Sequence, residues 1–99
     1  RKPSTLKCLI AGYYEASVSA SGTVANPNDG VKIELNRDLT ALDNIGARGV
    51  WDNTKYSSLG ASGLVSVTAG QYIWMSTKNY SGSADITFYS VNVILHRII

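Results

Sequence analysis

The stretch Tyr13-Tyr14-Glu15-Ala16-Ser17-Val18-Ser19-Ala20 alternates small apolar residues with polar ones. Successive side chains of a β-strand point to opposite faces, so this period of two predicts a strand with its alanines and its valine on the core face. Val31-Lys32-Ile33-Glu34-Leu35-Asn36-Arg37 repeats the pattern more strictly. Both stretches therefore predict strands that are buried on one side and solvated on the other.

Four further stretches extend this pattern toward the C-terminus. They are residues 64–67, 71–77, 84–89 and 91–99, and turns at 68–70 and 79–83 separate the first three. Residues 38–63 contain four glycines, and we expect them to form a long connection with short strand pieces and, at most, one helical turn. Short strands at this spacing predict an antiparallel all-β sandwich.

The composition agrees with a single β-rich domain. Ser, Thr, Asn and Gly supply 35 of the 99 residues, and the net charge is only +2 with the basic residues dispersed. This weak, scattered charge argues against a nucleic-acid partner, and no apolar run approaches the roughly 20 residues of a membrane span. The lone Cys8 excludes an internal disulfide, and we expect its thiol to be buried and inert in a strand. Because the sequence begins at Arg1, we expect one C-terminal domain of a longer chain, with residues 1–5 as a linker.

Catalysis finds little support among the acidic residues. Glu15 and Glu34 fall on the outward faces of strands that could pair, which leaves a carboxylate couple for glycoside cleavage open. The simpler interpretation is two solvated surface charges. No nucleophile elbow, phosphate loop or metal-ligand spacing occurs. We therefore expect no enzyme activity, no metal and no cofactor.

The last predicted strand, Val91–Ile99, is apolar on both faces. Val91, Val93 and Leu95 satisfy a core, so Ile94 and Ile98 need cover from the other side. The cover is either a second copy of the chain or a loop of the same chain. If it is a second copy, our interface candidates are Tyr72, Trp74, Ile94, His96 and Ile98.

Two segments combine aromatic rings with amides, carboxylates or hydroxyls, as saccharide sites require. One lies in the long connection at 51–56, and the other lies at 78–81. Loops often carry recognition, although Trp51 is equally suited to anchoring its loop to the core. The saccharide-binding candidates are Trp51, Asp52, Asn53, Lys55, Tyr56 and Tyr80.

The order of these signals resembles the tumour-necrosis-factor-like jelly roll, a family that includes complement-type heads. The resemblance is carried by Cys8–Tyr14, Val31–Arg37, Leu64–Met75 and Ser83–Leu95, and it spans roughly residues 5 to 97. Gln71 stands where the family usually has an acidic residue, and the Ser/Thr/Asn-rich, cysteine-poor composition is more similar to phage tail-fibre or tailspike C-terminal domains than to the animal branch.

This resemblance implies a homotrimer that locks a fibre and binds a host surface glycan, carried on the virion tail after assembly in the host cytoplasm. Two alternatives stay open. One is a purely structural trimerisation or capsid-decoration module, and the other is a secreted head that binds a protein receptor.

Overall fold

A computed structural model describes residues 5–26, 29–82 and 85–99, and within them the chain forms strands and no helix. Residues 1–4 of the expected linker, and Ala84 in the predicted strand 84–89, lie outside the described residues. The strands are β1 (Leu6–Lys7), β2 (Gly12–Val24), β3 (Asp29–Arg37), β4 (Thr40–Trp51), β5 (Ser57–Val67), β6 (Tyr72–Asn79) and β7 (Ile86–Arg97).

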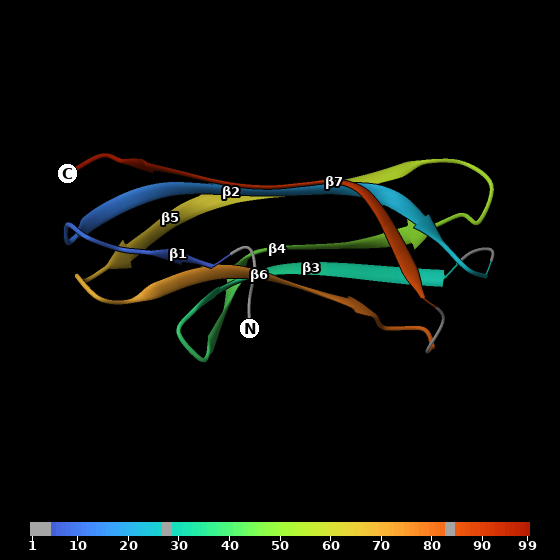
Figure 1. The fold of residues 1–99 in the computed structure, drawn as a ribbon, viewed down its shortest axis with the longest axis horizontal. Coiled ribbons are helices and arrows are strands. Elements are labelled where there is room, and N and C mark those ends of the chain that lie inside the picture. The colour runs from blue at the N-terminus through green and yellow to red at the C-terminus, as the bar shows by residue number, and fades with distance from the viewer. Residues whose placement is uncertain (1–4, 27–28, 83–84) are drawn as a thin grey trace.

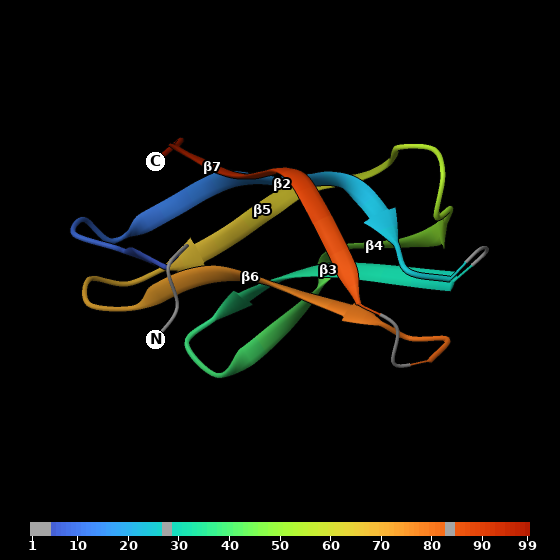
Figure 2. The ribbon, with the colours of Figure 1, turned by 45° about the vertical axis from the view of Figure 1, so that its right-hand side comes forward.

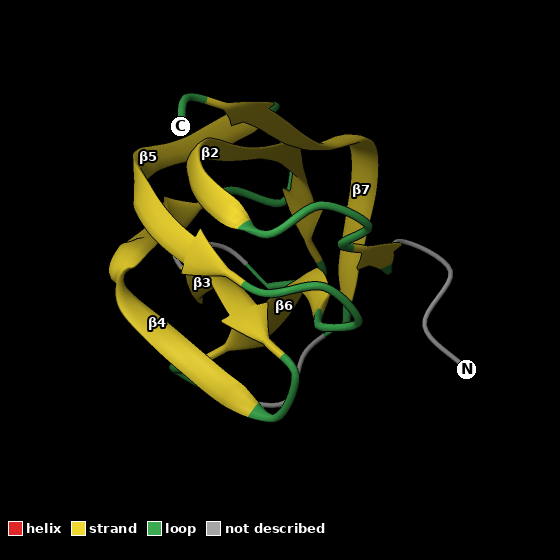
Figure 3. Ribbon diagram, turned by 90° about the vertical axis from the view of Figure 1, so that its left-hand side faces the viewer, coloured by secondary structure: helices red, strands yellow, loops and turns green. Residues whose placement is uncertain are grey.

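Two antiparallel sheets face each other, as the end-on view in Figure 3 shows. One has the order β1-β6-β3-β4, and the other has the order β5-β2-β7. Partners are nested along the chain: β2 pairs with β7, β3 pairs with β6, and β4 packs beside β5 where the two sheets meet (Figure 1). The predicted all-β class with antiparallel sheets is confirmed.

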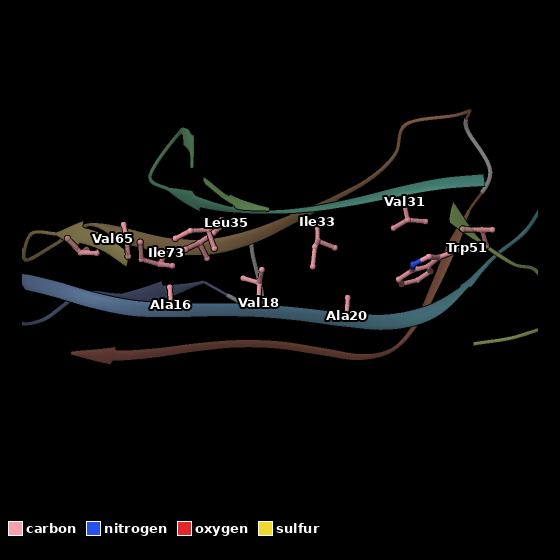
Figure 4. Packing of buried hydrophobic residues seen from close by; sticks show 12 residues of the cluster. Ala16, Val18, Ala20, Val31, Ile33, Leu35, Trp51, Val65 and Ile73 are labelled. Atoms are coloured by element: carbon pink, nitrogen blue, oxygen red, sulfur yellow. The ribbon is translucent and has the colours of Figure 1, made fainter. Parts of the chain in front are cut away.

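The core lies between the sheets and follows the predicted alternation. Ala16, Val18 and Ala20 of β2 point toward Val31, Ile33 and Leu35 of β3 (Figure 4), and all six side chains are buried. Burial of apolar surface at about 25 cal/mol per Å² is the main favourable contribution to such a fold. Val24, Ile45, Trp51, Val65, Val67 and Ile73 complete the central cluster.

The prediction of a long irregular connection over residues 38–63 is wrong, because β4 and β5 occupy most of it. Two of its four glycines, which in the sequence indicate strand breaks, make room where β4 and β5 pack together. Cβ atoms added at Gly49 and Gly63 would each lie 2.9 Å from a side-chain carbon, of Leu59 and Ile45 respectively. A strand tolerates glycine where another segment approaches this closely.

A β-bulge in β7 joins the two predicted strands 84–89 and 91–99 into one. Ser21 is opposite Ser90 and Gly22 is opposite Phe88, so Tyr89 is the extra residue. A Cβ at Gly22 would collide with the Thr87 carbonyl oxygen, which explains why the chain has glycine there.

The connections gather at the two ends of the sandwich. The β2–β3, β4–β5 and β6–β7 connections share the right-hand end of Figure 1, which we call the loop end. At the other end, the β3–β4 turn projects from the body of the fold (Figure 2). Asp38 adopts a positive φ of 53° in this turn, a conformation that aspartate tolerates better than most residues, and Leu39 beside it is 94 % exposed.

Candidate functional site

Trp51 is a core residue, so the expectation that its ring stacks on a ligand is wrong. Its side chain is only 1 % exposed, and its indole meets Phe88 edge to face with ring centroids 6.0 Å apart. The alternative interpretation, an anchor that holds the β4–β5 loop to the core, describes what Trp51 does. The buried ring fixes the start of the loop from which the next candidates project.

Asp52 shapes that loop. One carboxylate oxygen, Oδ1, accepts hydrogen bonds from the backbone N–H of Asn53 (2.6 Å) and of Thr54 (3.2 Å). This arrangement is an Asx turn, in which the side chain replaces a backbone acceptor. Asn53, Lys55 and Tyr56 are exposed beyond it. The loop therefore presents an amide, an ammonium and a phenol to solvent next to a turn that the Asp52 side chain stabilises.

Tyr56 stacks on a second tyrosine that our sequence reasoning missed. The rings of Tyr56 and Tyr89 lie 4.3 Å apart at a tilt of 38°, and they remain 71 % and 57 % exposed. Hydrogen bonding to Tyr56 raises the pKa of the Tyr89 hydroxyl above its ordinary value. The bulge in β7 presents Tyr89 at this position, and no signal in the sequence marked it.

Tyr80 occupies the other side of the loop end. Its backbone N–H donates to the Gly30 carbonyl. Its ring covers Gly30 so closely that a Cβ atom on Gly30 would collide with it. The guanidinium of Arg48 stands 5.3 Å from the ring centroid. The adjoining turn is held by the Asn79 side chain, whose amide oxygen accepts from the backbone N–H groups of Ser81 and Gly82. Tyr80 lies in the β6–β7 connection, whereas Tyr56 lies in the β4–β5 connection and Tyr89 lies in β7.

Ile94, His96 and Ile98 share the outer face of the β5-β2-β7 sheet. Ile94 is opposite Ser17, His96 is opposite Glu15, and the backbone N–H of Ile98 donates to the Tyr13 carbonyl. Ile94 is 61 % and Ile98 50 % exposed, so no loop of the described chain covers them. Tyr13 and Leu64 are exposed on the same face, and Leu64 is opposite Glu15, so Glu15 and His96 lie among these apolar side chains. We call these four apolar residues, Tyr13, Leu64, Ile94 and Ile98, the apolar patch.

Small residues occupy much of the rest of that face. Most outward positions of its three strands beyond the apolar patch are serine or glycine, and the Oγ atoms of Ser21 and Ser90 hydrogen-bond at 2.6 Å. Glu15 and His96 are the charged or ionisable side chains at its paired outward positions among the described residues. The small positions are Ser17, Ser19, Ser21, Ser58, Gly60, Ser62, Ser66 and Ser90.

Tyr72 and Trp74 lie on the other sheet, so the structure does not bring the five interface candidates together on one face. They line a shallow hollow of about 260 Å³ with Thr5, Asp38 and Leu39. The indole N–H of Trp74 donates to the Asp38 carbonyl at 2.7 Å, and the backbone N–H of Tyr72 donates to Asp38 Oδ1 at 2.9 Å. These bonds tie the β3–β4 turn to β6.

The structure brings together no catalytic group from those that the sequence offered. Glu15 faces outward from β2 and Glu34 from β3, in different sheets, so the two carboxylates lie on opposite outer faces of the sandwich. Cys8 is half-buried just after β1 rather than buried in a strand, and its thiol donates to the Ile10 carbonyl at 3.1 Å. Among the described residues, no group of three or more His, Cys, Asp or Glu side chains is placed to hold a metal ion. The same residues include no helical segment with the length and apolarity that crossing a bilayer requires.

Comparison with known proteins adds no relative. No protein-family model matches the chain, and the curated proteins searched include no significant match.

Proposed function

We propose that this domain is a non-catalytic, homotrimeric attachment module, of the kind found at the ends of phage tail fibres and tailspikes, and that it binds a host surface saccharide. The observation that carries the proposal is the apolar patch on an otherwise serine-rich face. The patch leaves large apolar side chains in water, and such patches mark interaction sites on soluble domains.

A second copy of the chain is the occupant that this face fits best. Serine and glycine residues let a facing backbone approach closely. The face also carries little charge that association would have to remove from water. Closed cyclic symmetry then satisfies every copy equally. In this arrangement the interface contains Ile94, His96 and Ile98, while Tyr72 and Trp74 on the opposite sheet stay outside it.

The jelly-roll assignment is part of the same proposal. Its support is the order of the strand neighbours: β2 pairs with β7, β3 pairs with β6, and β4 lies beside β5. This order is expected when one long antiparallel hairpin folds over into two sheets. The resemblance of Cys8–Tyr14 and Leu64–Met75 to that family supports the same topology. A location on the virion tail follows from this resemblance.

The Tyr56–Tyr89 pair is the proposed saccharide platform. Stacked, exposed rings present an apolar surface to the C–H face of a sugar, and Asn53 and Lys55 offer donors on the adjacent turn. Three such sites on one trimer gain strength by avidity, so each needs only modest affinity.

A glycan array probed with the purified domain tests this role. We expect binding to at least one surface polysaccharide, loss of it in Tyr56→Ala/Tyr89→Ala, and retention in Tyr56→Phe/Tyr89→Phe, which keeps both rings. Equal binding by the alanine and phenylalanine variants would contradict the platform. A trimer that binds no glycan would favour the purely structural module instead.

A further inference from the structure

Three cations lie in one row across the outer face of the β6-β3-β4 strands. Lys32 of β3 is directly opposite Lys78 of β6 on one side and Arg48 of β4 on the other. Directly opposite residues of antiparallel strands have Cβ atoms about 4.5–5.5 Å apart, and like charges in these positions destabilise a sheet. We call Lys78, Lys32 and Arg48 the cationic row.

The described residues around the row neutralise only part of its charge. Glu34, one step along β3 on the same face, places Oε2 3.5 Å from Lys32 Nζ. The residues opposite Glu34 are Ser76 and Gly46, neither of which is acidic. Three cations against one carboxylate leave two uncompensated positive charges on this face. Neither Lys78 nor Arg48 is buried, so both charges are open to a ligand.

The shape beside the row fits a small group. Gly46 has no side chain opposite Glu34, and a hollow of about 240 Å³ opens there between Lys32, Glu34, Gly46, Ala47 and Arg48. Tyr80 bounds the row on its other side, with its ring over Gly30 and within 5.3 Å of the Arg48 guanidinium. A cation row between a hollow and a partly exposed aromatic ring combines the two contacts that a charged sugar needs.

We propose that the cationic row and Tyr80 bind an anionic saccharide, with the lysines and Arg48 holding its sulfate, phosphate or carboxylate group and the Tyr80 ring contacting the sugar. This inference rests on the attachment role proposed above and names the chemical class of its ligand. Arg48 offers a planar fork of donors to such an oxyanion, and Lys32 and Lys78 add point charges. Glu34 is placed to accept a sugar hydroxyl beside the anionic group.

This face stays accessible in the proposed trimer. The cationic row points away from the β5-β2-β7 sheet, whose outer face carries the self-association. The Tyr56 and Tyr89 rings contact each other, whereas the Tyr80 ring lies by Gly30 and Arg48, so the two sites can be varied separately. Like-charge repulsion within the row is a cost to folding that a bound anion relieves.

The test measures binding of the purified 99-residue domain to dextran sulfate and to unmodified dextran, a pair that differs in the anionic group. We expect the wild type to prefer dextran sulfate, with affinity falling as salt rises. Lys78→Gln and Arg48→Gln should each weaken binding about threefold to tenfold. Lys7→Gln, which removes one exposed charge away from the row, is the matched control and should leave affinity unchanged. Lys78→Gln should not lower the melting temperature, because it removes repulsion, and this excludes misfolding as the cause.

Each other outcome has a distinct meaning. If Lys7→Gln weakens binding as much as Lys78→Gln, binding depends only on the net charge of the domain, and the assignment of the site to the cationic row is wrong. If inorganic polyphosphate binds as tightly as dextran sulfate, the saccharide assignment is wrong. If the domain binds neutral glycans through Tyr56 but not dextran sulfate, the anionic site fails while the attachment role stands. If it binds no saccharide of either kind, both fail.

Discussion

Ile94→Ser is the substitution that probes the proposed interface most selectively. Ile94 is 61 % exposed on the serine-rich face, so its loss costs the isolated protomer little packing. Full burial of an isoleucine side chain is worth about 1.5–3 kcal/mol, so covering the part that is still exposed contributes about 1–2 kcal/mol per protomer. Three protomers then lose about 3–6 kcal/mol per trimer, which lowers the association constant about 10²- to 10⁴-fold.

The assay is light scattering of Ile94→Ser over a dilution series, compared with the wild type. Val50→Ser is a matched control, because Val50 is 62 % exposed on the outer face of the other sheet. We expect the Ile94 variant to dissociate at concentrations where the wild type and Val50→Ser remain associated. Identical dissociation curves for the two variants would refute the reasoning. They would show that exposed apolar area on this face contributes no more to association than exposed apolar area on the other sheet.

Two further predictions concern the fold itself. Gly63→Ala places a Cβ 2.9 Å from Cγ1 of buried Ile45 and should lower stability by about 1–3 kcal/mol in urea unfolding, whereas Gly60→Ala meets only ordinary contacts and should not; equal effects would contradict the tight β4–β5 packing. Burial raises the pKa of the Tyr14 hydroxyl, aided by its contact with the Cys8 thiol. The protonated phenol therefore favours the folded state: its contribution is complete below about pH 10, the ordinary value, and is lost as pH rises through the raised folded-state pKa. Tyr14→Phe should show a shallower decline in melting temperature above pH 10, and matching profiles would argue against this linkage.

The strands with a strict period of two could be predicted from the sequence. Tyr13–Ala20 and Val31–Arg37 are parts of β2 and β3, with the predicted residues facing the core. β4 and β5 could not be predicted, because a glycine indicates the end of a strand when its neighbours in space are unknown. Gly49 and Gly63 are explained only by the side chains of Leu59 and Ile45, which pack where a Cβ would otherwise lie.

The candidate sites divide in a similar way. Tyr56 and Tyr80 were singled out by their polar neighbours in sequence, and both are exposed at the loop end. Trp51 was misread because a large aromatic in a loop suits either a core anchor or a ligand platform until its burial is known. The cationic row depends on the register of three strands, which no local pattern encodes, so its members appeared only as dispersed charges.

The native mass of the wild-type domain tests the central claim most directly. Light scattering across a wide dilution series should give about three times the 10.6 kDa of one chain, with dissociation only at the lowest concentrations. A mass of 10.6 kDa at every concentration would contradict the trimer, and the apolar patch would then need another occupant.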